Sequence, residues 1–126
     1  MAQSCLDASH NGTITFPEVV RRLTAAGFEG YIVDFRQNTR TYFLPDCSNT
    51  ALPMPPTTTG VAPAFNSSGI AAAVRDAQAN APGFTFQRFC ENVRACGCAG
   101  YIVSFLGKRV VYFGRTAETH VELFPQ

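Results

Sequence analysis

The sequence predicts an α+β domain in which a unit of helix, helix, strand and strand occurs twice. The first observation is a repeated motif, since residues 30–35 read GYIVDF and residues 100–105 read GYIVSF. The second is that the match continues without a gap on both sides, with eleven identities between residues 15–43 and residues 85–113. A constant offset of 70 residues over this length indicates an internal structural repeat rather than chance composition.

Length and composition predict that residues 1–126 form a single domain. The chain has 126 residues, of which 46% are hydrophobic, and this is enough for one core. The expected parts are repeat 1 at about residues 2–46, a proline-rich crossover at about residues 44–68 and repeat 2 at about residues 69–124. Two such units predict a mostly antiparallel sheet of four or five strands, with the helices on one face.

The main helix of each repeat is predicted from its start, its apolar stripe and its end. Thr15 and Thr85 are suited to be N-cap residues, and Glu18 completes a capping box in the first repeat. Gly27 and Gly97 follow the last apolar residues and are predicted to end the helices in the left-handed conformation. The stripes have helical spacing and consist of Phe16, Val19, Val20 and Leu23, and of Phe86, Phe89, Cys90 and Val93.

Each main helix is followed by a predicted hairpin, because the GYIV runs and the runs after them are rich in aromatic and β-branched residues. A two-residue loop of Gly107 and Lys108, in a type II′ turn, would place Phe105 opposite Val110. The Tyr-Val-Phe side of the sheet is predicted to face the helices, and the mixed side is predicted to be partly solvated. The mixed side consists of Ile32, Asp34, Thr41 and Phe43, and of Ile102, Ser104, Val111 and Phe113.

The remaining elements are shorter. Helices are predicted over residues 2–9 and 70–79, each before a main helix. The crossover holds five prolines, so we expect it to cover a face of the domain as a strap or to be mobile. Alternation predicts a fifth strand at Thr119–Leu123, whereas its counterpart in the first repeat, Asn49–Leu52, is predicted to be broken up by proline.

Charge and cysteine content exclude several classes of function. The net charge is +1 and the pI is about 7.6, so no overall field attracts nucleic acid or an anionic membrane. The N-terminus lacks the pattern of a signal peptide, and no run approaches the roughly 18 apolar residues of a spanning helix. Five cysteines without framework spacing favour free thiols in a reducing compartment. We therefore expect a cytoplasmic protein with no membrane partner, no metal site and no cofactor.

The best candidate site for a ligand surrounds His120. Glu118, His120 and Glu122 share one face if this segment is a strand, and Arg115 precedes them in a loop. Together they could perform acid–base chemistry or bind a ligand. The alternative is an edge strand whose charges prevent pairing with other strands.

A weaker candidate is a basic surface for nucleic acid at the ends of the hairpins. Basic side chains lie close in sequence to Tyr42 and Tyr112, and basic residues interleaved with aromatic residues are typical of strand-binding surfaces. The nearly neutral net charge argues against this function. The basic residues are Arg36, Arg40, Lys108, Arg109 and Arg115.

Two long runs in the second half carry a resemblance to a known family. Residues 98–105 read CAGYIVSF and residues 109–122 read RVVYFGRTAETHVE. These runs, with Thr15–Val20 and Tyr42–Asp46, resemble the YbcV-like family of small bacterial and prophage-associated proteins, often labelled phage envelope protein. The resemblance covers nearly the whole chain and carries over no catalytic residue. The family pattern has a Glu-Ser-His-Val-like run after the first hairpin, where this chain has Cys47–Ala51, so the resemblance implies that only the second copy, near His120, keeps that motif.

The sequence favours a non-enzymatic module that binds a small molecule or a protein partner with the solvated sheet face and the proline-rich crossover. A homodimer paired through a sheet edge is a further expectation for its partners. The alternative is a small enzyme that uses Glu118, His120 and Arg115, and nucleic-acid binding is the third hypothesis. A closed pocket around His120 would favour the enzyme, and an open face would favour the module.

Overall fold

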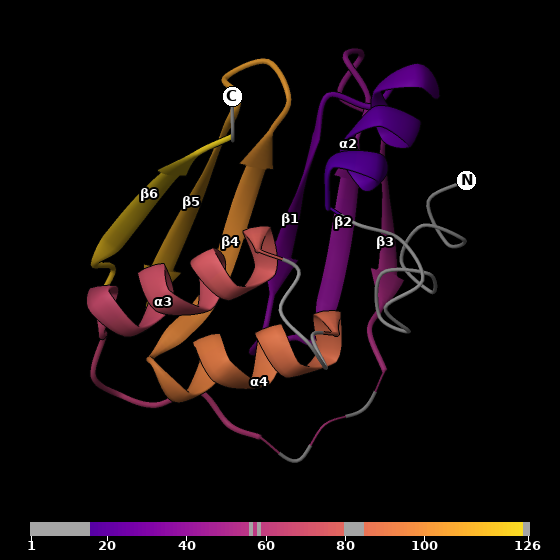
Figure 1. The fold of residues 1–126 in the computed structure, drawn as a ribbon. Coiled ribbons are helices and arrows are strands. Elements are labelled where there is room, and N and C mark those ends of the chain that lie inside the picture. The colour runs from indigo at the N-terminus through magenta and orange to yellow at the C-terminus, as the bar shows by residue number, and fades with distance from the viewer. Residues whose placement is uncertain (1–15, 56, 58, 80–84, 125–126) are drawn as a thin grey trace.

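A computed structural model describes residues 16–55, 57, 59–79 and 85–124, and it has an α+β fold (Figure 1). The helices of this part of the chain are α2 (Phe16–Ala25), α3 (Ser67–Gln78) and α4 (Phe86–Ala95). Its strands are β1 (Gly30–Asp34), β2 (Thr39–Phe43), β3 (Asn49–Pro53), β4 (Cys98–Ser104), β5 (Arg109–Gly114) and β6 (Thr119–Leu123). The helix predicted over residues 2–9 and the cap predicted at Thr15 lie outside the described residues.

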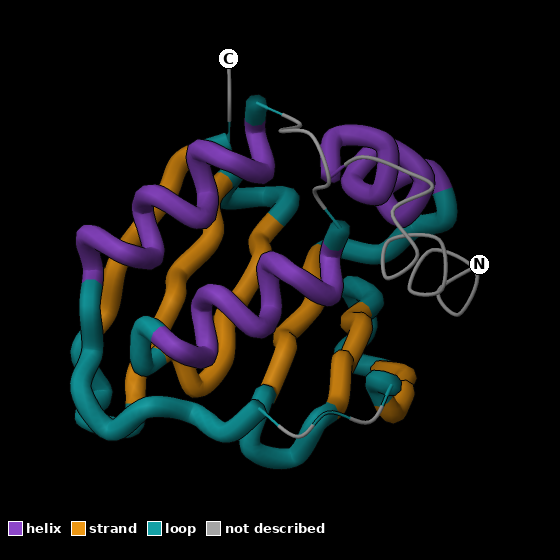
Figure 2. The backbone as a smooth tube through the Cα atoms, turned by 60° about the horizontal axis from the view of Figure 1, so that its bottom comes forward, coloured by secondary structure: helices purple, strands orange, loops and turns teal. Residues whose placement is uncertain are grey.

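The six strands form one antiparallel sheet in the order β3-β2-β1-β4-β5-β6. The two strands that carry the GYIV motif, β1 and β4, pair with each other at the centre, with Val33 opposite Tyr101. Each is the first strand of a three-stranded meander. Viewed from a second direction, all three helices lie on one side of this sheet (Figure 2).

The predicted count of four or five strands is wrong because β3 is a regular strand despite its proline. β3 lies at the edge of the sheet and pairs with β2. Pro53 is its last residue, opposite Thr39, and a proline at the end of an edge strand removes no essential hydrogen bond from the sheet. The next residue, Met54, donates its backbone N–H to the carbonyl of Asn38 at 2.9 Å.

The predicted two-residue hairpin loops are also wrong, because four residues separate the strands of each hairpin, 35–38 and 105–108. The Ser104 hydroxyl accepts a hydrogen bond from the backbone of Gly107, and Lys108, rather than Gly107, has the positive φ of 51°. Val103 therefore lies opposite Val110, two residues away from the predicted register. A shift of two residues leaves every side chain on its predicted face.

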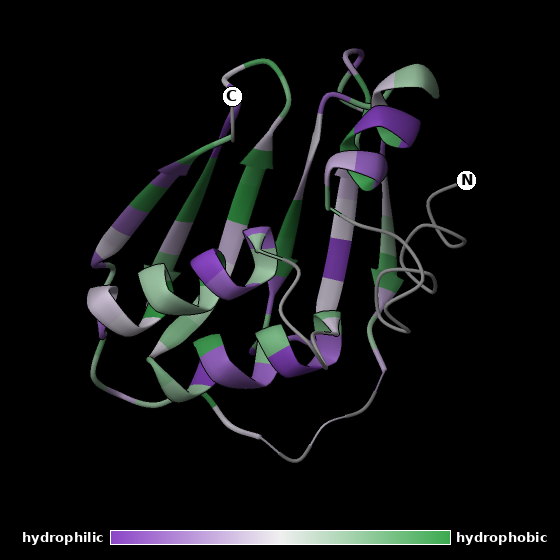
Figure 3. Cartoon of the chain, viewed as in Figure 1, coloured by the Kyte–Doolittle hydropathy of each residue, from purple (hydrophilic) through white to green (hydrophobic). Residues whose placement is uncertain are grey.

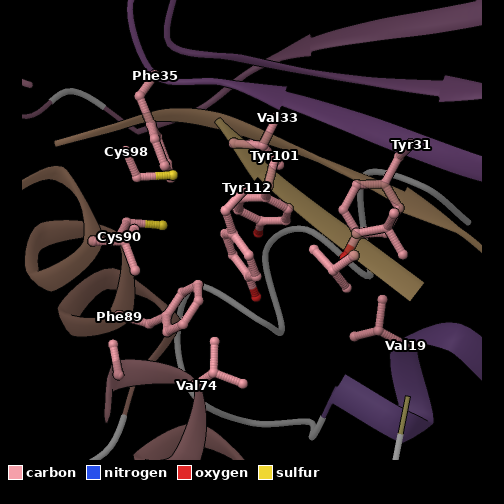
Figure 4. Close-up of a cluster of buried hydrophobic side chains, with 14 of the residues drawn as sticks. Val19, Tyr31, Val33, Phe35, Val74, Phe89, Cys90, Cys98, Tyr101 and Tyr112 are labelled. Carbon is pink, nitrogen blue, oxygen red and sulfur yellow. The ribbon is translucent and has the colours of Figure 1, made fainter. Parts of the chain in front are cut away.

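The core lies between the helices and the Tyr-Val-Phe side of the sheet, as predicted. In Figure 4 the rings of Tyr101 from β4 and Tyr112 from β5 point towards Phe89 of α4 and Val74 of α3. The Tyr101 and Tyr112 rings are 5.3 Å apart, and the Phe89 ring is 6.3 Å from that of Tyr101. The helices themselves are amphipathic, with hydrophilic and hydrophobic residues on each (Figure 3).

The crossover is tied to the C-terminal end of α4. Ala62 donates to the carbonyl of Arg94, and Asn66 donates to the carbonyl of Cys96 at 2.7 Å. The Asn66 side chain then accepts from the backbone of Gly69 and caps α3. These bonds fix where α3 begins relative to the sheet. No helix within the described ranges is long and apolar enough to cross a membrane.

Candidate functional site

His120 lies on β6, on the side of the sheet that the helices cover. Its ring is 6.3 Å from that of Tyr112, its neighbour on β5. Nδ1 of His120 is 2.7 Å from Oγ of Ser67, the first residue of α3. Nε2 is 2.5 Å from Oε2 of Glu122, two residues further along β6. A polar chain of three side chains therefore connects the start of α3 to the edge of the sheet.

The chemistry of the partners assigns the hydrogen positions in this chain. A carboxylate only accepts hydrogen bonds, so Nε2 of His120 carries the hydrogen that points to Glu122. In the neutral imidazole, Nδ1 then accepts from the hydroxyl of Ser67. A hydroxyl bonded to an imidazole that a carboxylate orients is the arrangement of an activated nucleophile. The same hydrogen bonds also hold α3 to β6, and we call this second role a structural tie.

Two of the four residues predicted for this site bond elsewhere. The Glu118 carboxylate accepts from the Thr116 hydroxyl at 2.7 Å, and Arg115 donates to the carbonyl of Val61 at 3.3 Å. The structure brings His120 and Glu122 together and adds Ser67, which the sequence did not indicate. Ser67 is 53 residues away and carries no local signal beyond its place near a helix start.

The face of the sheet opposite the helices is uncovered in the described structure. Its central row crosses all six strands without a charged residue and runs through Ala51, Thr41, Ile32, Ile102, Val111 and Val121. Ile102 is 42% exposed and Val121 is 48% exposed. The flanking rows add Phe43, Phe113 and Leu123, of which Leu123 is 61% exposed. We call these three rows the uncovered face.

A shallow hollow of about 200 Å³ lies at one end of the uncovered face. Ile32 of β1, Phe43 of β2 and Ile102 of β4 line it, together with Ser104 and Glu29. It opens on the side opposite His120, so the hollow and the polar chain are separate features.

The predicted basic surface at the hairpin ends loses one of its five members. Arg36, Lys108, Arg109 and Arg115 are exposed, but Arg40 is only 1% exposed. Arg40 lies opposite Val33, so strand alternation places it on the side that the helices cover. It cannot contact a nucleic acid from there.

The cysteines of the described segments are free thiols, and they include no exposed pair. Cys47 is exposed, whereas Cys90 and Cys98 are buried. Burial raises the pKa of Cys90 and of Cys98 to about 12, so neither is a nucleophile at neutral pH. Among the residues that the structure describes, no group of three or more His, Cys, Asp or Glu side chains could hold a metal ion.

Comparison with protein-family models and with curated proteins finds no match for this chain. Membership of the YbcV-like family stays a prediction that rests on the runs quoted above.

Proposed function

We propose that the protein is a non-enzymatic interaction module that forms a homodimer, with the uncovered faces of two copies packed against each other. The observation that carries this proposal is the uncharged, largely apolar row that crosses all six strands, in which Ala51, Ile102 and Val121 are exposed and the other three residues are half-buried. Contiguous apolar patches of this kind are uncommon on monomeric proteins and mark interaction surfaces. Two antiparallel sheets pack readily face to face, with their strands at about 30°.

The size of the uncovered face suits a modest dimer. Six strands about 4.8 Å apart, with five residues of about 3.3 Å each, project an area of roughly 500 Å². The accessible area of a side-chain surface exceeds its projection, so the face approaches the roughly 800 Å² per partner of a standard interface. We therefore expect a dimer that dissociates at micromolar concentrations.

Charge also favours a second copy as the partner. The three rows of the uncovered face contain Asp34 and Arg109 as their charged residues. One acid and one base give the face no net charge, so two copies do not repel each other. An acidic or basic partner would instead favour a face with charges of one sign.

We also propose that the two halves arose from one duplicated unit, as the repeat in the sequence predicts. The first residues of α2 and α4, of β2 and β5, and of β3 and β6 are each 70 positions apart. Duplication would have doubled the width of the apolar face, because the halves join at their first strands.

Sedimentation velocity between about 10 µM and about 1 mM tests the dimer. We expect the wild type to associate with increasing concentration and Ile102→Lys to remain monomeric, with unchanged circular dichroism. Ala72→Lys places the same charge on an exposed position of α3 and should leave the dimer intact. A wild type that stays monomeric throughout would refute the proposal. A dimer that survives Ile102→Lys would indicate pairing through a sheet edge.

A further inference from the structure

Arg40 is a buried cation between two aromatic rings. Its guanidinium carbon is 4.8 Å from the centre of the Tyr31 ring and 4.5 Å from the centre of the Phe86 ring. The side chain is 1% exposed. Nη1 donates to the Tyr42 hydroxyl at 3.3 Å. Within the described part of the chain, Nε and Nη2 have no hydrogen-bond partner.

The burial of these two nitrogens without hydrogen-bond acceptors costs free energy. An arginine keeps its charge in proteins, and the two rings stabilise that charge through their faces. The rings cannot satisfy N–H groups that point outward in the plane of the guanidinium. Buried donors without acceptors are rare in folded proteins, and each calls for an explanation.

The positions of the two nitrogens specify what would complete the site. Nε–H and Nη2–H lie on the same edge of the guanidinium and point in parallel directions. This edge donates to both oxygens of a carboxylate at once. The Tyr42 hydroxyl holds the other end of the group, so the edge that remains is the one best suited to a planar anion.

The repeat indicates that folding does not require an arginine at this position. At the offset of 70 residues, Arg40 corresponds to Val110. Val110 is opposite Val103 on β4, as Arg40 is opposite Val33 on β1, and Val110 is also buried. The same place in the sheet therefore accepts an aliphatic side chain that needs no partner. Arg40 adds a charge to a core position, and no acidic side chain of the described residues forms an ion pair with it.

We propose that Arg40 anchors a binding site for a small organic carboxylate. The two oxygens of the ligand accept from Nε and Nη2, and its carbon atoms pack among the surrounding rings. A carboxylate is favoured over phosphate because its single charge balances one guanidinium and its planar head fits between two rings. Phe86 is half-exposed and is the first residue of α4, so rotation of its side chain gives the ligand a route to Arg40.

The direct test is the Arg40 Nε–H resonance of the wild-type protein, followed by NMR during titration with sodium benzoate. We expect a saturable shift of that resonance and a rise in the melting temperature. Sodium chloride should cause neither effect. Because the resonance is measured on the wild type, the test does not depend on the folding of a variant.

Two variants and two further anions locate the site. Arg40→Val, with the residue of the other repeat, should fold and should lose the thermal response to benzoate. Arg94→Met removes a second buried arginine, which donates to Asn38, and should keep the response. Acetate should act more weakly than benzoate, because it offers less carbon for the rings. Inorganic phosphate should have no effect.

Three results would overturn the proposal. The first is an Arg40 resonance that does not move with benzoate, and the second is an equal thermal response in Arg40→Val. The third is a shift of the same resonance, without any ligand, when a carboxylate of the chain itself is replaced by its amide, which would show that this carboxylate occupies the free edge. Binding of phosphate in preference to benzoate would overturn the choice of a planar anion.

Discussion

At the scale of single residues, His120 has one neutral tautomer that satisfies both of its partners. The hydrogen on Nε2 serves Glu122, and Nδ1 accepts from Ser67. We predict that ¹⁵N chemical shifts of the neutral ring show this tautomer. Ser67→Ala should lower the free energy of unfolding by about 1 kcal/mol, the usual contribution of one such bond. Urea denaturation measures this, and Ser68→Ala at the neighbouring exposed position should change it by less than about 0.5 kcal/mol.

Labelling with a fluorophosphonate, combined with the same urea denaturation, separates a structural tie from a nucleophile. A tie predicts that Ser67 does not react with a fluorophosphonate, and that both Ser67→Ala and His120→Ala are destabilised. Two results together would contradict the structural tie. Ser67 would be labelled in the wild type but not in His120→Ala, and Ser67→Ala would leave the stability unchanged. They would instead support the enzyme hypothesis with Ser67 in place of Arg115 and Glu118.

The site could be predicted from the sequence only where its residues are close along the chain. Strand alternation places His120 and Glu122 on one face without any knowledge of the fold. Ser67 reaches them because α3 lies across β6, and the sequence around Ser67 does not encode that crossing. Arg40 shows two signals in conflict, since its charge suggests exposure and its place in the strand indicates burial. The strand position decides the outcome.

At the scale of elements, Gly27 and Gly97 provide a matched pair of helix ends. Both have positive φ, 96° and 86°, but their surroundings differ. A Cβ at position 27 would have Leu44 as its nearest neighbour at 3.9 Å, whereas a Cβ at position 97 would lie 2.0 Å from the carbonyl oxygen of Ala64. Gly27→Ala therefore meets only backbone strain, and Gly97→Ala also displaces the crossover.

We predict that Gly27→Ala lowers the free energy of unfolding by about 1 kcal/mol, the typical cost of the left-handed conformation for alanine. Gly97→Ala should lower it by more than about 3 kcal/mol, because backbone atoms must move. Urea denaturation of both variants gives the comparison. Equal losses would mean that the crossover adjusts without cost, and that its hydrogen bonds to the end of α4 contribute little to stability.

The elements were predictable where two copies of the sequence agree, and unpredictable where they differ. The main helices and the GYIV strands follow from matched apolar stripes and glycines. β3 was missed because proline outweighed the strand pattern in the sequence, whereas an edge strand tolerates proline at its end. The hairpin loops were predicted too short because the sequence does not show that the Asp34 and Ser104 side chains accept hydrogen bonds from the loop backbone.

At the scale of the whole molecule, alternation alone cannot say what covers the second face of a sheet. The helices cover one face, and the central row of the other face has no charged residue and a single hydroxyl, that of Thr41. Each strand taken alone shows a mixture of polar and apolar residues on this side, which predicts a partly solvated face. Only the register aligns Ile32, Ile102 and Val111 into a single row. That alignment is the reason for preferring an interaction surface over a simple solvent face.

The buried thiols and tyrosine hydroxyls of the core predict how the stability of the whole molecule depends on pH. Burial raises the pKa of Cys90 and Cys98 from 9.0 to about 12, and it raises the pKa of the Tyr101 and Tyr112 hydroxyls above 10.0. The unfolded chain therefore releases these protons at a lower pH than the folded protein does. Their contribution to stability is fully present below about pH 9 and is lost as the pH rises towards 12.

We predict that the free energy of unfolding, measured by urea denaturation, changes little between about pH 7 and pH 9 and then falls. Each buried thiol contributes a slope of up to about 1.4 kcal/mol per pH unit. Cys90→Val, which introduces the residue that stands 70 positions earlier, Val20, should make the decline shallower. Cys47→Ser, at an exposed thiol, should leave the slope unchanged. A Cys90→Val slope equal to that of the wild type would mean that Cys90 reaches solvent in the folded protein. The core between the helices and the sheet would then be open to solvent at its centre, in contradiction to the burial of Cys90.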